Sequence, residues 1–263
     1  MEKILVSGDS WSNPKFKSRL NPDYINTFTW SDMLKGDVTN ISINGIDNVS
    51  IVNNALWSIY NDKPDRVILA LSCWSRYSTP NYRMNPLFLF NVASKTKYIP
   101  NYQHDKKEYT RMLRHLAGMM DTTVEDIDDV YGFVSHFIKD NIPLFVSNTC
   151  LALHNIIHIC NHLQIKLHIF QTFKAWSCAA DINNNKSLFE KELISSDLFL
   201  DLYDSNADLI GYPWLQGAGG FDVASEILSH KTDILGNGDG HPNENGHRKI
   251  GEWFNATYEN YEI

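Results

Sequence analysis

The sequence predicts an α/β domain built on a mainly parallel sheet, and two observations lead to this prediction. Apolar and β-branched runs alternate with amphipathic segments through the first 72 residues, in the order strand, helix, strand, helix, strand. This alternation is typical of right-handed βαβ units. Hydrophobic residues make up 43% of the 263 residues, enough for a large core. Because the sequence shows no repeat or linker, we expect one domain over residues 1–263.

Each early element has a start or stop signal beside it. Gly8-Asp9 ends the first apolar run, Gly36 ends the first helix, and Pro64-Asp65 introduces the apolar run RVILAL. The turn signal Asn44-Gly45 follows the second strand. The predicted elements are strands over 3–7, 38–43 and 66–71 and helices over 28–34 and 49–60.

The rest of the chain is less regular. Two stretches, near 73–107 and 174–235, have little periodicity and include the glycine-rich loop QGAGGFD. We expect them to be insertions near the strand ends that set specificity, because long irregular insertions are often binding loops. Residues 143–147 either begin a helix or form a short strand. The remaining predicted elements are helices over 108–120, 123–140, 148–163 and 244–258 and a strand over 166–173.

Composition narrows the possible partners. The net charge of -8 argues against general nucleic-acid binding, which needs a basic surface. No unbroken run approaches the roughly 18 apolar residues of a membrane span, and no signal peptide is recognised. We therefore expect no membrane partner and a cytoplasmic or virion-associated protein. The cysteines are spaced like ordinary buried thiols and not like a disulfide framework or a zinc site; they are Cys73, Cys150, Cys160 and Cys178.

The tripeptide Gly8-Asp9-Ser10 directly follows the first predicted strand. Ligands of open parallel sheets bind beyond the carboxyl ends of the strands, so Ser10 is placed where a hydroxyl could react. A serine needs a base, and the segment GNGDGHPNENGHRKIG supplies His241, with Asp239 two residues before it and Asn243 as an expected helix N-cap. The Gly-Asp-Ser tripeptide and the Asp-Gly-His-Pro-Asn segment are each common turn sequences. Found together in this order around a βαβ sheet, they indicate a catalytic site more specifically than either does alone.

These residues resemble the SGNH, or GDSL-type, hydrolase family. The family's first block corresponds to Gly8-Asp9-Ser10, the glycine of its second block to Gly45, and the acid and histidine of its last block to Asp239 and His241. GDSWS, NGIDN and DGHPNENGH also look like the divergent versions found in bacteriophage proteins.

The resemblance implies a three-layer α/β/α, flavodoxin-like fold and ester hydrolysis without a metal or cofactor. Ser10 would be the nucleophile, His241 the base, and Asp239 the acid that orients the imidazole. The backbone N–H groups of Ser10 and Gly45 would form the oxyanion hole. The substrate would be a small-molecule or glycan ester, such as an acetylated carbohydrate. Further pocket positions suggested by the blocks are Asp9, Trp11, Asn44, Trp74 and Arg76.

Two departures from the family pattern leave alternatives open. The third block has an asparagine that completes the oxyanion hole, but here Trp74 stands in its place, and Arg76 or the Ser72 hydroxyl could substitute. For Trp74 a core or pocket-wall position is favoured, and for Arg76 a surface ion pair.

Because the third-block asparagine is missing, an alternative function stays open: an inactive binding or structural protein that keeps the fold, such as a phage particle component.

The second departure is the acid. The family's acid lies three residues before the histidine, where this chain has Gly238. Asp239 is therefore the first choice, with Asp233, Asp222 or a backbone carbonyl in reserve.

Four other histidines are predicted to have no catalytic or metal-binding role. His154, His158 and His162 recur every four residues on one helix face, opposite an apolar stripe, and are predicted to be a solvated polar face and not a metal site. His247 is expected to be exposed on the last helix.

Overall fold

The structure is a computed structural model of the chain. It describes residues 1–18, 20–72, 74, 77–79, 82–84, 130–172, 195–205, 209–210, 222–236 and 239–258. Within these ranges, side chains are described outside 77–84, 130–142 and 203–210. The predicted insertion at 73–107, the helix at 108–120, Cys73, Arg76 and Cys178 lie wholly or largely outside the described residues, as does most of the insertion at 174–235.

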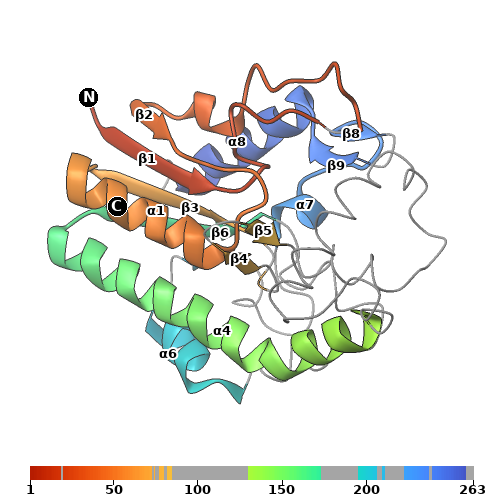
Figure 1. Ribbon diagram of the computed structural model, residues 1–263. Helices are drawn as coiled ribbons and strands as arrows, with labels where there is room; N and C mark the ends of the chain where they lie inside the picture. Colours follow the sequence, from red (N-terminus) through yellow and green to blue (C-terminus); the bar gives the residue numbers. More distant parts are fainter. Residues whose placement is uncertain are drawn as a thin grey trace.

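A five-stranded parallel sheet forms the centre of the molecule (Figure 1). Its strand order is β2-β1-β3-β6-β7, which is the doubly wound order of flavodoxin-like folds. The order reverses between β1 and β3, and ligands of such sheets bind at this point. The predicted α/β fold with a parallel sheet is therefore confirmed. The strands are β1 (Lys3–Gly8), β2 (Asp37–Asn40), β3 (Arg66–Leu71), β6 (Lys166–Gln171) and β7 (Leu209–Ile210).

Helices cover both faces of the sheet and make a three-layer arrangement (Figure 1). One face carries α1 (Asn48–Asp62) and α4 (Val130–Leu163), with α6 (Asp197–Ser205) packed on α4. The other face carries η1 (Trp30–Met33), α7 (Val223–Glu226) and α8 (Glu244–Tyr258). Two hairpins complete the described elements: β4 (Tyr77–Thr79) with β5 (Tyr82–Met84), and β8 (Ile234–Gly236) with β9 (Asp239–Pro242).

The strands are buried on both faces, so they read as continuous apolar runs. Leu5 and Leu69 belong to the core under α1 and α4, whereas Ile4 and Ile68 belong to the core under α8. This alternation follows from the two-residue period of a strand.

The helix expected over 28–34 is the short 3-10 helix η1, and the strand expected over 166–173 ends at Gln171. Helix α4 and strand β2 also differ from the sequence prediction. Helix α4 is continuous from Val130 to Leu163 with Pro143 inside it, where we expected two helices separated near that proline. A proline removes one backbone donor and is a break signal in the sequence, yet the helix continues on both sides of Pro143. Strand β2 ends at Asn40 and not at residue 43, because the Asn40 side chain accepts a hydrogen bond from the N–H of Ser42 and forms a local turn.

By length and composition, the helical segment Pro143–Leu163 could cross a membrane. Its buried residues nevertheless belong to the core beneath the sheet, and 44% of its most apolar window is buried inside the molecule. Cys150 and Cys160 lie in this core, and burial raises the pKa of both thiols to about 12. These two cysteines are therefore unreactive packing residues, as the sequence predicted.

Candidate active site

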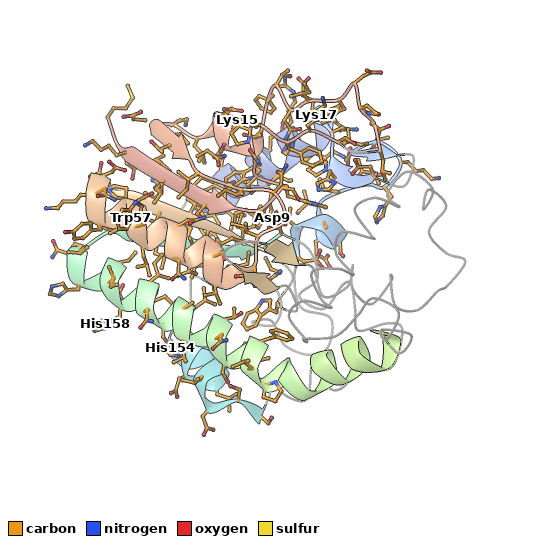
Figure 2. The ribbon with its side chains drawn as sticks, in the orientation of Figure 1. Asp9, Lys15, Lys17, Trp57, His154 and His158 are labelled. Atoms are coloured by element: carbon orange, nitrogen blue, oxygen red, sulfur yellow. The ribbon has the colours of Figure 1, made fainter. Side chains whose placement is uncertain are left out.

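The turn after β1 presents Ser10 at the carboxyl edge of the sheet. Gly8 is needed here, because a Cβ at this position would lie 2.9 Å from the Cβ of Ala70 and 2.9 Å from the Oγ of Ser12. The buried carboxylate of Asp9 accepts a hydrogen bond from the N–H of Trp11 at 3.0 Å, which closes the turn. Figure 2 shows Asp9 at the end of β1. Asp9 therefore shapes the turn.

The structure brings Ser10 and His241 together. The imidazole Nε2 of His241 lies 2.8 Å from the hydroxyl oxygen of Ser10, although 231 positions separate the two residues. His241 stands on β9, in the short hairpin that precedes α8. Asn243 begins that helix and accepts from the N–H of Gly246 at 3.0 Å, as expected of an N-cap.

Asp239 lies on the other side of the imidazole. Its Oδ1 is 2.5 Å from Nδ1 of His241 and also accepts the backbone N–H of His241 at 3.0 Å. An ionised carboxylate only accepts, so Nδ1 carries the proton and the Nε2 lone pair faces Ser10. Burial alone would raise the pKa of Asp239, but hydrogen bonds from His241 and Ser18 outweigh it and hold the pKa below its usual value.

The two reserve acids are engaged elsewhere. Asp222 caps α7 by accepting from the N–H of Ser225 at 2.8 Å. Asp233 is buried and binds the Lys249 ammonium at 2.7 Å, and its pKa is lowered to about 2: burial opposes this shift, but the hydrogen bonds it accepts outweigh burial. Thus the carboxylate at Nδ1 of His241 belongs to Asp239.

The segment that carries Gly45 runs beside the serine turn. The N–H of Ile43 donates to the carbonyl of Gly8 at 3.0 Å, so the chain that leads into Gly45 is fixed to the residue two before Ser10. Within the described residues, no backbone carbonyl accepts a hydrogen bond from the N–H of Ser10 or of Gly45. Asn44 is held by Asn13, whose amide donates to it at 2.8 Å.

Glycine at position 45 is favoured by the backbone conformation. We expected glycine here because the absence of a Cβ lets its backbone approach closely, and a Cβ added at Gly45 would meet no described atom within 4 Å. Its φ of 70° is what favours glycine, because side chains destabilise the left-handed region.

The position of the family's third-block asparagine holds a core residue. Trp74 is 1% exposed, packs edge-on against Phe199, and donates its indole N–H to the side-chain oxygen of Gln171 at 3.1 Å. That N–H is therefore unavailable to a ligand. The buried hydroxyl of Ser72 has no partner within the described residues. Arg76, the other proposed substitute, lies outside them.

Two aromatic rings lie near the imidazole of His241. Phe16 stacks on His241, with ring centroids 4.2 Å apart and an interplanar angle of 25°. The ring centroid of Trp11 lies 6.4 Å from that of His241. The sequence suggested Trp11 but missed both Phe16 and Ser18, because neither belongs to a recognised block. The one available signal is the alternation of charged residues with Phe16 and Ser18 in PKFKSRL, which is typical of an extended segment with one buried face.

His154, His158 and His162 do not join this site. His158 and His162 are exposed on α4, and His154 lies 3.0 Å from the carbonyl of Leu198 on α6 (Figure 2). In the part of the chain that the structure describes, no group of three or more His, Cys, Asp or Glu side chains could hold a metal.

His247 contradicts the prediction that it is exposed. It is 1% exposed. It shares the inner face of α8 with Ile250 and Phe254, at the i, i+3 and i+7 spacing that places residues on one helix face.

No family model and no curated protein sequence matches the chain. Among solved structures, it is similar to a protein from Desulfitobacterium hafniense DCB-2 described as a lipolytic protein of the G-D-S-L family. That similarity has 11% identity, a TM-score of 0.44, and coverage of 97% of this chain and 99% of that one. The psychrotrophic esterase EstA from Pseudoalteromonas sp., in a structure inhibited by monoethylphosphonate, has 12% identity, a TM-score of 0.39, and coverage of 98% and 97%.

Proposed function

We propose that the protein is a serine hydrolase of carboxylic esters, with Ser10 as nucleophile, His241 as general base and Asp239 as the acid that orients it. The observation that carries this proposal is the hydrogen-bonded chain from Ser10 through His241 to Asp239, located where the strand order reverses. A hydroxyl, an imidazole and a carboxylate connected in this order are the functional unit of serine acyl hydrolases on unrelated folds.

In the acylation step, the Ser10 oxygen attacks the ester carbonyl while its proton passes to Nε2 of His241. Collapse of the tetrahedral intermediate breaks the bond to the alcohol, which leaves with the proton from Nε2. In deacylation, water takes the place of the alcohol: His241 removes one proton, and the acid is released as the proton returns to Ser10. Asp239 stabilises the imidazolium in both steps and stays ionised, consistent with its lowered pKa.

The oxyanion of each intermediate would be bound by the backbone N–H groups of Ser10 and Gly45. Each such donor is worth about 3 kcal/mol, or a factor of roughly 100 in rate. Because Trp74 uses its indole N–H in the core, a third donor would have to come from another group. With two donors alone, the enzyme would be slower than one with three but clearly faster than water.

We further propose that the acyl group is small, such as acetyl, and that the alcohol is a carbohydrate hydroxyl. Phe16 and Trp11 crowd the imidazole, and this favours a compact acyl group. The carbohydrate is supported by the family resemblance alone. Comparing turnover of p-nitrophenyl acetate and p-nitrophenyl octanoate tests the first part, and acetate release from acetylated xylan or acetylated monosaccharides tests the second.

The decisive experiment labels the nucleophile with a fluorophosphonate. We expect stoichiometric labelling that maps to Ser10 by peptide mass spectrometry and disappears in Ser10→Ala. Ser12→Ala is the matched control, since Ser12 lies in the same turn but its hydroxyl accepts the indole N–H of Trp30 at 3.1 Å. If the folded wild-type chain stays unlabelled and hydrolyses no acyl ester, the enzyme proposal is wrong and a non-catalytic scaffold with this fold replaces it.

A further inference from the structure

A short segment after the serine turn lies against the acid and the histidine. Residues 13–18 form this segment, and backbone hydrogen bonds hold it in place. The N–H of Asn26 donates to the carbonyl of Phe16 at 2.9 Å, and the N–H of Ser18 donates to the carbonyl of Tyr24 at 3.2 Å. An antiparallel bridge pairs Lys17 with Ile25. The segment is therefore fixed to the following chain independently of Asp239 and His241.

The side chains of this segment alternate between two faces. Lys15 and Lys17 are exposed, and Figure 2 shows them away from α1 and α4. Phe16 and Ser18, 6% and 2% exposed, face inward. The two-residue period of extended chain thus places two neighbouring inward side chains on the two members of the acid–base pair.

The hydroxyl of Ser18 is directed by its two partners. Its oxygen accepts the N–H of Asn21 at 2.8 Å, and it also forms a hydrogen bond with Oδ2 of Asp239. Because an ionised carboxylate carries no proton, the Ser18 hydroxyl must be the donor in the second bond. Ser18 thereby occupies Oδ2, and Oδ1 is left for the two N–H groups of His241.

The ring of Phe16 restrains the imidazole itself. The two rings are nearly parallel, and their centroids are 4.2 Å apart. Rotation of the imidazole about χ1 or χ2 would break this stacking together with the hydrogen bond to Ser10. The stacked ring also covers one face of the imidazole, and 29% of the His241 side chain stays exposed.

We propose that residues 13–18 act as a two-point clamp on the acid–base pair, with Ser18 the positioning residue of Asp239 and Phe16 the positioning residue of His241. This inference rests on the proposed hydrolase function. The clamp keeps the carboxylate ionised and rotated so that Oδ1 faces Nδ1, and it keeps Nε2 in reach of the Ser10 hydroxyl. The role of Ser18 requires no contact with the substrate.

The test compares Ser18→Ala with Lys17→Ala, a matched change of the neighbouring exposed side chain. A hydrogen bond to a charged group contributes about 1.5–3 kcal/mol, so we expect Ser18→Ala to lower kcat by about 10- to 100-fold, with KM changed less than about twofold. Ser18→Thr, which keeps the hydroxyl, should recover most of the rate. Phe16→Leu should lower kcat by about three- to tenfold, as expected for loss of an aromatic pair.

A second readout does not require turnover. The short hydrogen bond between Nδ1 of His241 and Asp239 should give a strongly downfield proton resonance, assigned by its loss in His241→Gln. We expect this resonance to shift upfield or broaden in Ser18→Ala and to be unchanged in Lys17→Ala. If wild type hydrolyses no ester but the resonance responds in this way, the hydrolase proposal fails and the positioning role of Ser18 remains.

The clamp is overturned if Ser18→Ala matches Lys17→Ala in kcat and in the resonance, with thermal unfolding showing both variants folded. If Ser18→Ala does not fold, Ser18→Cys takes its place under the same criterion, because a thiol nearly preserves the volume but is a weak donor.

Discussion

Replacing His247 with leucine should make the protein less sensitive to acid. His247 is buried on the inner face of α8, and neither ring nitrogen has a hydrogen-bond partner within the described residues. Burial is the main reason that its pKa is lowered from 6.5 to about 4; the Asp32 carboxylate opposes the shift and His241 adds to it. The folded state therefore holds His247 neutral.

The magnitude follows from the difference between the two pKa values. The unfolded chain takes up a proton near pH 6.5 and the folded chain only near pH 4, so protonation favours unfolding between these values. Stability is fully present above pH 6.5 and falls as the pH drops toward 4. Since one pKa unit corresponds to 1.36 kcal/mol, His247 accounts for a loss of about 2 kcal/mol between pH 7.5 and pH 5.

Urea unfolding at pH 7.5 and pH 5 measures this effect. In wild type we expect the free energy of unfolding to fall on acidification by about 2 kcal/mol more than in His247→Leu. Wild type and variant share His168, whose pKa is also lowered to about 4, by burial first and then by Arg66 and Lys166. The difference between the proteins therefore isolates His247. If both lose the same stability between the two pH values, the reasoning is wrong.

Two further substitutions test the surroundings of the site. Trp74→Phe should lower the free energy of unfolding by about 1–3 kcal/mol in thermal or urea unfolding, because the Gln171 side-chain oxygen loses the indole donor. Fluorophosphonate labelling of Ser10 should be unchanged. A tenfold lower labelling rate would mean that Trp74 contributes to the active site. Gly45→Ala should lower the free energy of unfolding by about 1–2 kcal/mol through the φ of 70° alone, since the added methyl group meets no described atom within 4 Å. A loss above 4 kcal/mol in the same unfolding assay would mean that other residues occupy the space around the methyl group.

The parts of the fold that were predictable are those with a strong local pattern. RVILAL and the helix 244–258 were placed with the bounds that β3 and α8 have, because one is a continuous apolar run between clear signals and the other follows an N-cap. Helix α4 was predicted as two helices because Pro143 is a local break signal, but the helix continues through it.

The same limit applies to the site. Ser10, His241 and Asp239 were selected from short blocks near the two ends, and the structure places them in hydrogen-bond contact. Ser18 and Phe16 could not be selected, because their roles depend on contact with residues more than 220 positions away. His247 could have been placed correctly from its spacing to Ile250 and Phe254, and weighing it by polarity alone gave the wrong result.

The 231 positions between Ser10 and His241 have a consequence for synthesis of the chain. A nascent polypeptide that has emerged only as far as α7 already contains the hydroxyl but has no base to activate it. Reactivity toward a phosphonate should therefore arise abruptly, when the β8–β9 hairpin leaves the ribosome and docks. Time-resolved capture of Ser10 during translation or refolding would thus report the moment at which the β8–β9 hairpin docks beside the turn after β1.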